Sequence, residues 1–554
     1  MTVTLGSMAR AARIAAVCAA AALVLLPVAP ARADDIVRPP RMDKPPAGYR
    51  LTGNQAAAIA DRSPKIVALR RKHPGAFSNV FEKSGLRWQV SYYERDPPNK
   101  EIGQVYVSDV TGRITEAWTG PQVAWTMARG YAGAFGRKIN SPWVWIPLAL
   151  LFVVPFVDPR RPLRVRHLDL LVLMAFGVSV AFFNDANIDV SVPLAYPLLL
   201  YLLGRALWIG LRGRPREALR PLVPISWLLV GLLFLMGFRV GLNIADSNVI
   251  DVGYAGVIGA NRIAHGEPLW GNFPKDNEHG DTYGPINYAA YVPFERVMPW
   301  SGKWDSLPAA HAAAIFFDLL CLGLIFLIGR QLRGPPLGVT LAYAWAANPF
   351  TLYAMNCNVN DALVGALVLG AIVVATRPAG RGALIGLAGM AKFAPLGLAP
   401  LFARHTRGSA LRTAIGLAAA LVPCLVLVLA YGGLHAFYDR TLGFQASRGS
   451  PFSVWGLYDW TAPQAVVQAG AAILAVALAF VPRRRDVVGL SALCAAVLIA
   501  LQLGVTHWFY LYLVWFLGPL LVALLADGEP DRRAVPLSYV EELGKLPAPA
   551  VAWR

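Results

Sequence analysis

Two aspartates in the segment 244–307 are the first side chains that could carry out chemistry. Asp246 and Asp251 are five residues apart, a spacing that does not pair them on a helix, whereas Asp251 and Tyr254 are three apart and share a helical face. A carboxylate can take a proton from an attacking hydroxyl group, and it is the usual base in sugar chemistry. We therefore expect Asp251 to be the general base of a catalytic pair in which Asp246 has an orienting or a structural role. The alternative for Asp251 is a solvated loop acid.

Polar residues follow at two further places in the chain. Asp281 and Tyr283 precede Gly284-Pro285, where they either contact a substrate or shape a turn. Asn360 and Asp361 stand in an N-x-N-D motif, which could contact a sugar or cap the next helix. Both pairs are candidate substrate contacts.

Three cationic or hydrogen-bonding side chains could stabilise a departing phosphate. Lys392 stands inside an apolar segment, and burying a lysine there costs about 2.5–3.5 kcal/mol on insertion scales, which favours a functional role. Its alternative is to snorkel to the cytoplasmic interface. Arg448 lies in Q-A-S-R-G-S-P-F-S-V-W-G, and His507 opens H-W-F-Y, which ends at Tyr510. The alternative is that Arg448 and His507 lie at the membrane interface, beside a belt of aromatic side chains.

The order of these motifs resembles that in the bacterial GT-C glycosyltransferases, over about residues 220–526. The most similar group is glycosyltransferase family 87, the polyprenyl-phosphate-dependent mannosyl- and arabinofuranosyltransferases. That family has a D-x-x-Y motif, an H-G-x-x-L-aromatic segment, a K-x-x-P in a broken hairpin and a polar motif near the last helix. The matching positions here are Asp251 and Tyr254, His265-Gly266 with Trp270, Lys392 and Pro395, and H-W-F-Y at 507–510.

This resemblance implies a membrane enzyme that transfers a sugar from a polyprenyl-phosphate donor to a cell-envelope glycan or glycolipid acceptor. The reaction would take place at the extracytoplasmic side of a bacterial-type plasma membrane. No cofactor is expected besides the lipid-linked donor, and the absence of a D-x-D motif favours chemistry without a metal. The expected substrate-binding residues are Tyr254, Asp281, Tyr283, Asn360, Asp361, Lys392, Arg448, His507 and Tyr510.

Two other functions remain open from the sequence. A transporter or flippase of a polar lipid or lipid-linked sugar also needs broken helices and buried charge, but it favours internal repeats, and none is evident. A sensor anchored by its helices would not explain the acid-rich segment 244–307. Nucleic acid is not an expected partner, because the net charge of +18 is spread in short clusters between apolar runs. The sequence names no protein partner.

The elements that must position these residues are membrane helices. Of the 554 residues, 56% are hydrophobic and only 15% are charged, whereas soluble domains carry roughly 25% charged residues. A membrane span takes roughly 20 apolar residues as a helix. The candidate spans are about 142–157, 168–184, 191–210, 221–243, 308–330, 336–356, 361–376, 410–431, 463–481, 487–504 and 507–526.

The distribution of arginines predicts the orientation of these spans, because cytoplasmic loops are enriched in Lys and Arg. Bases cluster in alternate connectors, whereas the connectors N-D-A-N-I-D and C-N-V-N-D hold none. Only the segment 383–403, which has bases on both sides, breaks the alternation. We predict that it is a re-entrant hairpin, which gives eleven crossings with residues 531–554 as a cytoplasmic tail.

The N-terminus has the three parts of a secretory signal over residues 1–33, ending at Ala31-Arg32-Ala33. The alternative is an uncleaved first membrane helix. Residues 34–138 predict a small extracytoplasmic α+β domain: a helix over 54–71 interrupted at Pro64, then strands with a hairpin at 110–113. This part resembles the PepSY-type fold and shows no catalytic constellation. We interpret it as a binding or regulatory module, followed by the GT-C-like membrane domain over 139–530.

Overall fold

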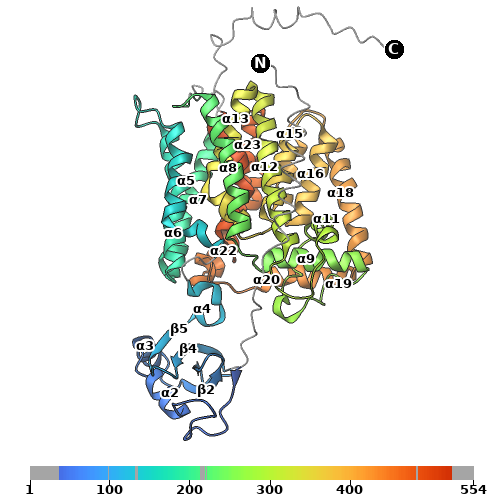
Figure 1. The fold of residues 1–554 in the computed structure, drawn as a ribbon. Coiled ribbons are helices and arrows are strands. Elements are labelled where there is room, and N and C mark those ends of the chain that lie inside the picture. The colour runs from blue at the N-terminus through green and yellow to red at the C-terminus, as the bar shows by residue number, and fades with distance from the viewer. Residues whose placement is uncertain are drawn as a thin grey trace, which may run out of the picture.

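The computed structural model describes residues 36–526 except 98, 131–134, 212–218, 220 and 482–483. A small domain of strands and short helices lies at one end of a larger helical bundle (Figure 1). The predicted signal segment 1–33 and the tail 531–554 fall outside the described residues. So do some bases on which the predicted orientation drew, namely Arg212, Arg214, Arg216, Arg220 and Arg483.

The N-terminal domain is an antiparallel sheet in which the strands follow one another in chain order. Helices α2 (Gly53–Ala60) and α3 (Pro64–Lys72) pack on the sheet around Trp88. Pro64 occupies the first position of α3, where its missing N–H is not needed, so the predicted helix break is confirmed. The predicted hairpin is also present, between β4 and β5. The strands are β1 (Ile36–Val37), β2 (Phe77–Lys83), β3 (Arg87–Tyr93), β4 (Glu101–Ser108) and β5 (Ile114–Thr119).

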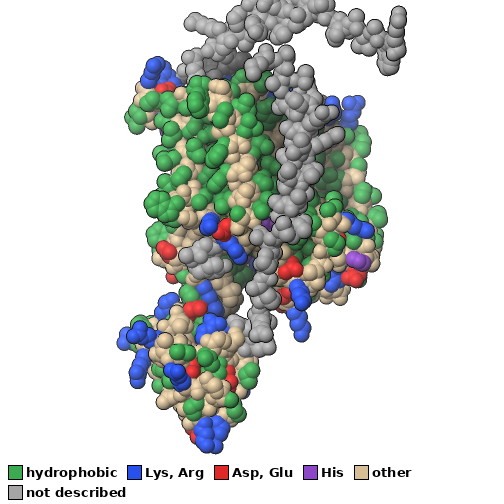
Figure 2. All heavy atoms as spheres, in the orientation of Figure 1, with side chains coloured by type: hydrophobic (Ala, Val, Ile, Leu, Met, Phe, Trp, Pro, Cys, Tyr) green, Lys and Arg blue, Asp and Glu red, His purple; other side chains and the backbone are tan. Residues whose placement is uncertain are grey.

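Five helices of the bundle are long and apolar enough to cross a membrane: α6 (Val165–Asn184), α7 (Ile188–Leu211), α8 (Ile225–Ala245), α12 (Pro308–Arg333) and α18 (Ala410–Ala430). Hydrophobic side chains cover the flank of the bundle, and charged side chains gather near its ends and on the small domain (Figure 2). The protein is therefore a mostly helical membrane protein. The predicted number of eleven crossings stays a prediction, because the other apolar helices are shorter.

These shorter helices complete the bundle. They are α5 (Pro142–Val153) with η3 (Val154–Phe156), α13 (Pro335–Ala347), α14 (Pro349–Asn356), α15 (Asp361–Val373), α22 (Thr461–Ala477), α23 (Val487–Leu503), and η7 (Tyr510–Tyr512) with α24 (Leu513–Leu525). The predicted span 336–356 is divided into α13 and α14 at Asn348. Pro349 has no backbone N–H to donate, so it cannot continue α13 without loss of a helical hydrogen bond. The chain instead starts a new helix, and the Asn348 side chain caps α14 by accepting from the Phe350 amide.

The segment 383–403 runs into the bundle and returns to the same end. Helix α16 (Pro378–Ala391) stops before Lys392, and η5 (Ala394–Leu398) and α17 (Ala399–Ala403) lead back. The two flanks are in contact, because an Arg381 Nη2 donates to Ser409 Oγ at 2.5 Å. This path is compatible with the predicted re-entrant hairpin, which, like the number of crossings, stays a prediction.

Two segments form the end of the bundle nearest the small domain (Figure 1). The segment 244–307 folds into α9 (Asp251–His265), η4 (Lys275–Asn277), α10 (Pro285–Ala289) and α11 (Val292–Val297). The segment 432–462 folds into α19 (Gly433–Tyr438), the π-helical turn η6 (Asp439–Gly443), α20 (Phe444–Ser447) and α21 (Val454–Leu457). Between β5 and α5 lie α4 (Pro121–Ala124), η1 (Thr126–Arg129) and η2 (Arg137–Asn140).

Candidate active site

Helix α9 is held against the turn that precedes α15. The Asn248 amide donates to the carbonyl of Asn356 at 3.1 Å. A Cβ atom at Gly253 would lie 2.0 Å from the carbonyl oxygen of Asn358, so only glycine permits this close approach. Because Asp251 is the first residue of α9 and Asp361 is the first of α15, this packing brings both carboxylates to one cavity.

That cavity has a volume of about 490 Å³ and is called the acidic cavity below. Asp251 is exposed to it, and no cation among the described residues lies within ion-pair distance of its carboxylate. Although Asp251 faces the cavity, its position within the protein removes bulk water from the carboxylate, and this desolvation raises its pKa. The Val252 amide and the charge of Arg448 act in the opposite direction. A carboxylate with a raised pKa is a stronger base at neutral pH than an ordinary aspartate.

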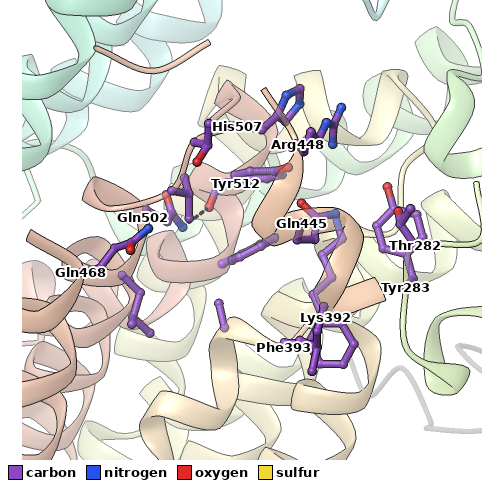
Figure 3. Close-up of a pocket in the computed structure, with 16 residues that line it drawn as sticks. Thr282, Tyr283, Lys392, Phe393, Gln445, Arg448, Gln468, Gln502, His507 and Tyr512 are labelled. Carbon is purple, nitrogen blue, oxygen red and sulfur yellow. Dashed lines mark hydrogen bonds between the residues drawn. The ribbon is translucent and has the colours of Figure 1, made fainter. Parts of the chain in front are cut away.

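A second cavity of about 290 Å³ is called the cationic cavity, and Figure 3 shows the side chains that line it. Lys392 lines it together with glutamines and with apolar side chains such as Leu442 and Leu501. Four side chains line both cavities and therefore form the boundary between them: Tyr283, Arg448, His507 and Tyr512.

Lys392 points into the protein at the tip of the hairpin. Its Nζ lies 2.7 Å from Asp361 Oδ1 and 5.3 Å from each of the ring centres of Tyr283, Tyr512 and Trp515. Its side chain is only 8% exposed. The alternative that Lys392 snorkels to the cytoplasmic interface is therefore wrong.

Asp361 contacts both Lys392 and Trp515. Besides Lys392, its Oδ1 accepts a hydrogen bond of 2.7 Å from Trp515 Nε1, whereas its Oδ2 is buried without a hydrogen-bond partner among the described residues. Asp361 thus neutralises Lys392 and keeps one acceptor oxygen for a ligand. Asn360 does not cap α15 with its side chain, which donates instead to Asn287.

Arg448 and His507 form the wall shared by the two cavities. His507 Nδ1 lies 2.9 Å from Ser450 Oγ, and that hydroxyl also accepts from the Phe452 amide at 3.3 Å. The hydroxyl proton can therefore go to Nδ1, which leaves the ring proton on Nε2. Arg448 and Lys392 line the cationic cavity with His507, so two cations already stand beside its ring.

Three of the predicted acids and tyrosines near Asp251 lie outside both cavities. Asp246 pairs with Lys138 at 3.2 Å. Tyr254 donates to Asp276 at 3.2 Å and packs on Trp304. Asp281 is buried and accepts from Arg440 Nε at 2.7 Å, which ties the segment 244–307 to η6. The structure gives these residues positions in the framework of the site.

Tyr510 and Asn360 also lie outside the cavities. The Tyr510 hydroxyl lies between the hydroxyls of Ser179 and Ser191, at 2.7 and 2.6 Å, and it fixes η7 against α6 and α7. Among the predicted set, the structure therefore brings together Asp251, Tyr283, Asp361, Lys392, Arg448 and His507.

Several cavity residues have no counterpart among the predicted ones. Tyr512 lines both cavities, Trp515 holds Asp361, and Gln445 and Gln502 line the cationic cavity. The aromatic run after His507 predicts a membrane interface, which conceals that Tyr512 faces the site. Among the described residues, no group of three or more His, Cys, Asp or Glu side chains could hold a metal ion.

Residues 282–526 match the family model of Glycosyltransferase family 87. The matched segment contains Lys392, Arg448 and His507 and covers less than half of the chain, and it begins after Asp251. No curated protein and no solved structure matches the chain. This similarity supports a membrane glycosyltransferase, and it does not favour a transporter.

Proposed function

We propose that this membrane protein transfers a sugar from a polyprenyl-phosphate donor to a cell-envelope glycan or glycolipid, with Asp251 as the general base. The observation that carries the proposal is one shared cavity: the Asp251 carboxylate and the Arg448–His507 pair line the same space. A base and a phosphate-binding pair are the two groups that an inverting sugar transfer needs on opposite sides of the sugar.

The cationic cavity suits the donor. Arg448 and His507 line it together with Phe393 (Figure 3), and Leu442 and Leu501 add further apolar wall. A prenyl chain needs apolar walls, and its phosphate needs charge-assisted hydrogen bonds. We assign the acidic cavity to the acceptor, because an acceptor hydroxyl must reach Asp251.

The chemical step follows from this placement. The acceptor hydroxyl gives its proton to the Asp251 carboxylate and forms a bond from its oxygen to the anomeric carbon. The bond between that carbon and the phosphate oxygen breaks, and the phosphate leaves with the electron pair. Arg448 and the Nε2–H of His507 stabilise the added charge, while Lys392, which is paired with Asp361, holds the wall of the cationic cavity in place.

The proposed orientation places the small domain and both cavities outside the cytoplasm of a bacterial-type plasma membrane. The described bases of the alternate connectors lie at the opposite end of the bundle, where α6 begins and α12 ends. Bases at the cytoplasmic end support this orientation. Eleven crossings plus the hairpin are part of the proposal, and mannose and arabinofuranose are the proposed donor sugars.

A transfer assay tests the function. Purified protein in nanodiscs is given polyprenyl-phosphate mannose or arabinofuranose with a labelled sugar, together with envelope glycan and glycolipid extracts. We expect label in the acceptor fraction and an equal amount of released polyprenyl phosphate. A flippase would instead move the intact lipid between the leaflets of proteoliposomes, and that result would contradict the proposal.

A further inference from the structure

The connector of residues 120–130, between the N-terminal domain and the bundle, forms part of the cavity wall. Its residues Ala124, Trp125, Thr126 and Met127 line the acidic cavity together with Asp251. This connector lies outside the segment that matches a known family. The connector that leaves the small domain therefore contributes wall residues to the candidate site.

Trp125 contacts the two residues proposed to hold the departing phosphate. The guanidinium carbon of Arg448 lies 5.3 Å from the Trp125 ring centre, and the His507 ring centre lies 5.7 Å from it. Phe452 packs edge-to-face against Trp125, with the ring centres 5.4 Å apart. An indole in this place limits the rotamers of Arg448 by a cation–π contact and closes one side of the His507 ring.

The N-terminal domain holds the connector from the opposite side. Arg129 in η1 donates to Gln104 Oε1 on strand β4 at 2.6 Å. Gln122 in α4 donates to the carbonyl of Ala186 at 2.7 Å, in the turn between α6 and α7. The connector is thus clamped between the sheet and the bundle, and the clamp fixes the position of Trp125.

We propose that Trp125 is a positioning residue that holds Arg448 and His507 for the donor phosphate, and that the N-terminal domain sets its position through Arg129. The inference rests on the proposed function. It makes the N-terminal domain a structural part of the transferase site, beyond the binding or regulatory module that its sequence indicates.

The test measures binding of farnesyl phosphate, a short polyprenyl phosphate, to full-length variants in detergent by calorimetry, alongside donor KM and kcat. Trp125→Leu should weaken binding and raise donor KM by about 2- to 30-fold, the range of a cation–π contact, with kcat at saturating donor retained. Trp125→Phe should restore binding to within about twofold, because the ring is kept. Arg129→Ala should shift both in the same direction as Trp125→Leu, but less.

Trp143→Leu is the matched control, because Trp143 is 88% exposed on α5 and touches neither cavity. Unchanged affinity of folded Trp125→Leu, with Arg448→Ala weakened, would overturn the positioning role and leave the proposed function in place. If Arg129→Ala binds farnesyl phosphate with unchanged affinity, the proposed role of the N-terminal domain in positioning Trp125 is wrong. If the parent binds no farnesyl phosphate and transfers no sugar, the proposed function fails and this inference fails with it.

Discussion

Two aspartates face the acidic cavity, and their surroundings assign them different tasks. Asp361 is bound to Lys392 and Trp515 through one oxygen, so its charge is already neutralised. Asp251 is exposed to the cavity, and among the described residues no cation pairs with it. A base must reach a proton and must not be held by a cation. These requirements favour Asp251 over Asp361.

Replacing Asp251 should therefore abolish turnover while the protein still folds. Asp251→Asn keeps the shape of the side chain but cannot accept a proton, and loss of a general base costs about a hundred- to ten-thousandfold in rate. Asp246→Asn is the matched control, because Asp246 pairs with Lys138 outside the cavity and should cost much less. Initial rates of sugar transfer in nanodiscs give the comparison. If both variants transfer sugar at the rate of the parent protein, the acidic cavity is not the active site.

The pH dependence of the reaction should report the environment of Asp251. The protein around this carboxylate raises its pKa from the ordinary value of 3.8. Because only the deprotonated form accepts a proton, kcat/KM should fall as the pH drops through this raised pKa, at a higher pH than for an exposed aspartate. The Asp246→Asn variant should keep this limb unchanged. A limb at or below the ordinary value would contradict the assignment of the base.

Part of this residue set could be predicted from sequence, for a physical reason in each case. A lysine in an apolar hairpin is too costly to be accidental, and Lys392 does lie in the site. Helical spacing does not say what covers a face, so it could not show that Tyr254 turns to Asp276 while Asp251 faces the cavity. The positions of Tyr512 and Trp125 in the cavity walls could not be predicted, because an aromatic residue in an apolar segment has the same pattern whether it lines a cavity or faces lipid.

At the scale of elements, the hairpin and α9 position the chemistry by close backbone approach. A Cβ atom at Gly284 would lie 2.0 Å from the carbonyl oxygen of Met390, so the turn that carries Tyr283 packs directly on the end of α16. The return of the segment 383–403 to the end of the bundle where it starts could be predicted, because the bases on its two sides favour a single side of the membrane. The contact of Gly284 with α16 could not be predicted, since a glycine before a proline is typical of any turn.

The Lys392–Asp361 pair joins the tip of the hairpin to the start of α15, and it should matter for stability as well as activity. The two side chains are only 8% and 1% exposed, and breaking a buried pair by removing one partner costs about 3–5 kcal/mol. Lys392→Met should therefore lower the thermal denaturation temperature in detergent. Lys392→Met with Asp361→Asn should regain most of the loss, because no buried charge is then unpaired. Equal stability of the single variant and the parent would show that the pair is solvated.

At the scale of the whole molecule, the site is assembled from distant parts of the chain at one end of the bundle. Helix α9, the hairpin tip, the segment 432–462 and the connector after the small domain all meet there (Figure 1). The membrane class could be predicted from composition, because so few charged residues cannot cover a soluble protein of this size. The contact between the connector and the bundle could not be predicted from the sequence, because it depends on how the small domain packs against the bundle.

The proposed orientation can be tested with single cysteines and a thiol reagent that does not cross membranes, since the described native cysteines Cys321, Cys357, Cys424 and Cys494 are buried. In intact cells, a cysteine at Ala446, in the segment 432–462, should be labelled from outside. A cysteine at Leu163, which is 97% exposed between α5 and α6, should react only after lysis.

The hairpin adds a second condition to the same experiment. Cysteines at Arg377 and Arg407, which flank the hairpin, should both react only after lysis, because the contact between Arg381 and Ser409 places the two flanks on one side. Labelling of one flank from outside would turn the hairpin into a crossing. The bases after it would then lie outside, against the enrichment of arginine in cytoplasmic loops. If Leu163→Cys is labelled in intact cells, the proposed orientation is wrong. Asp251 would then face the cytoplasm, away from donors presented at the outer face.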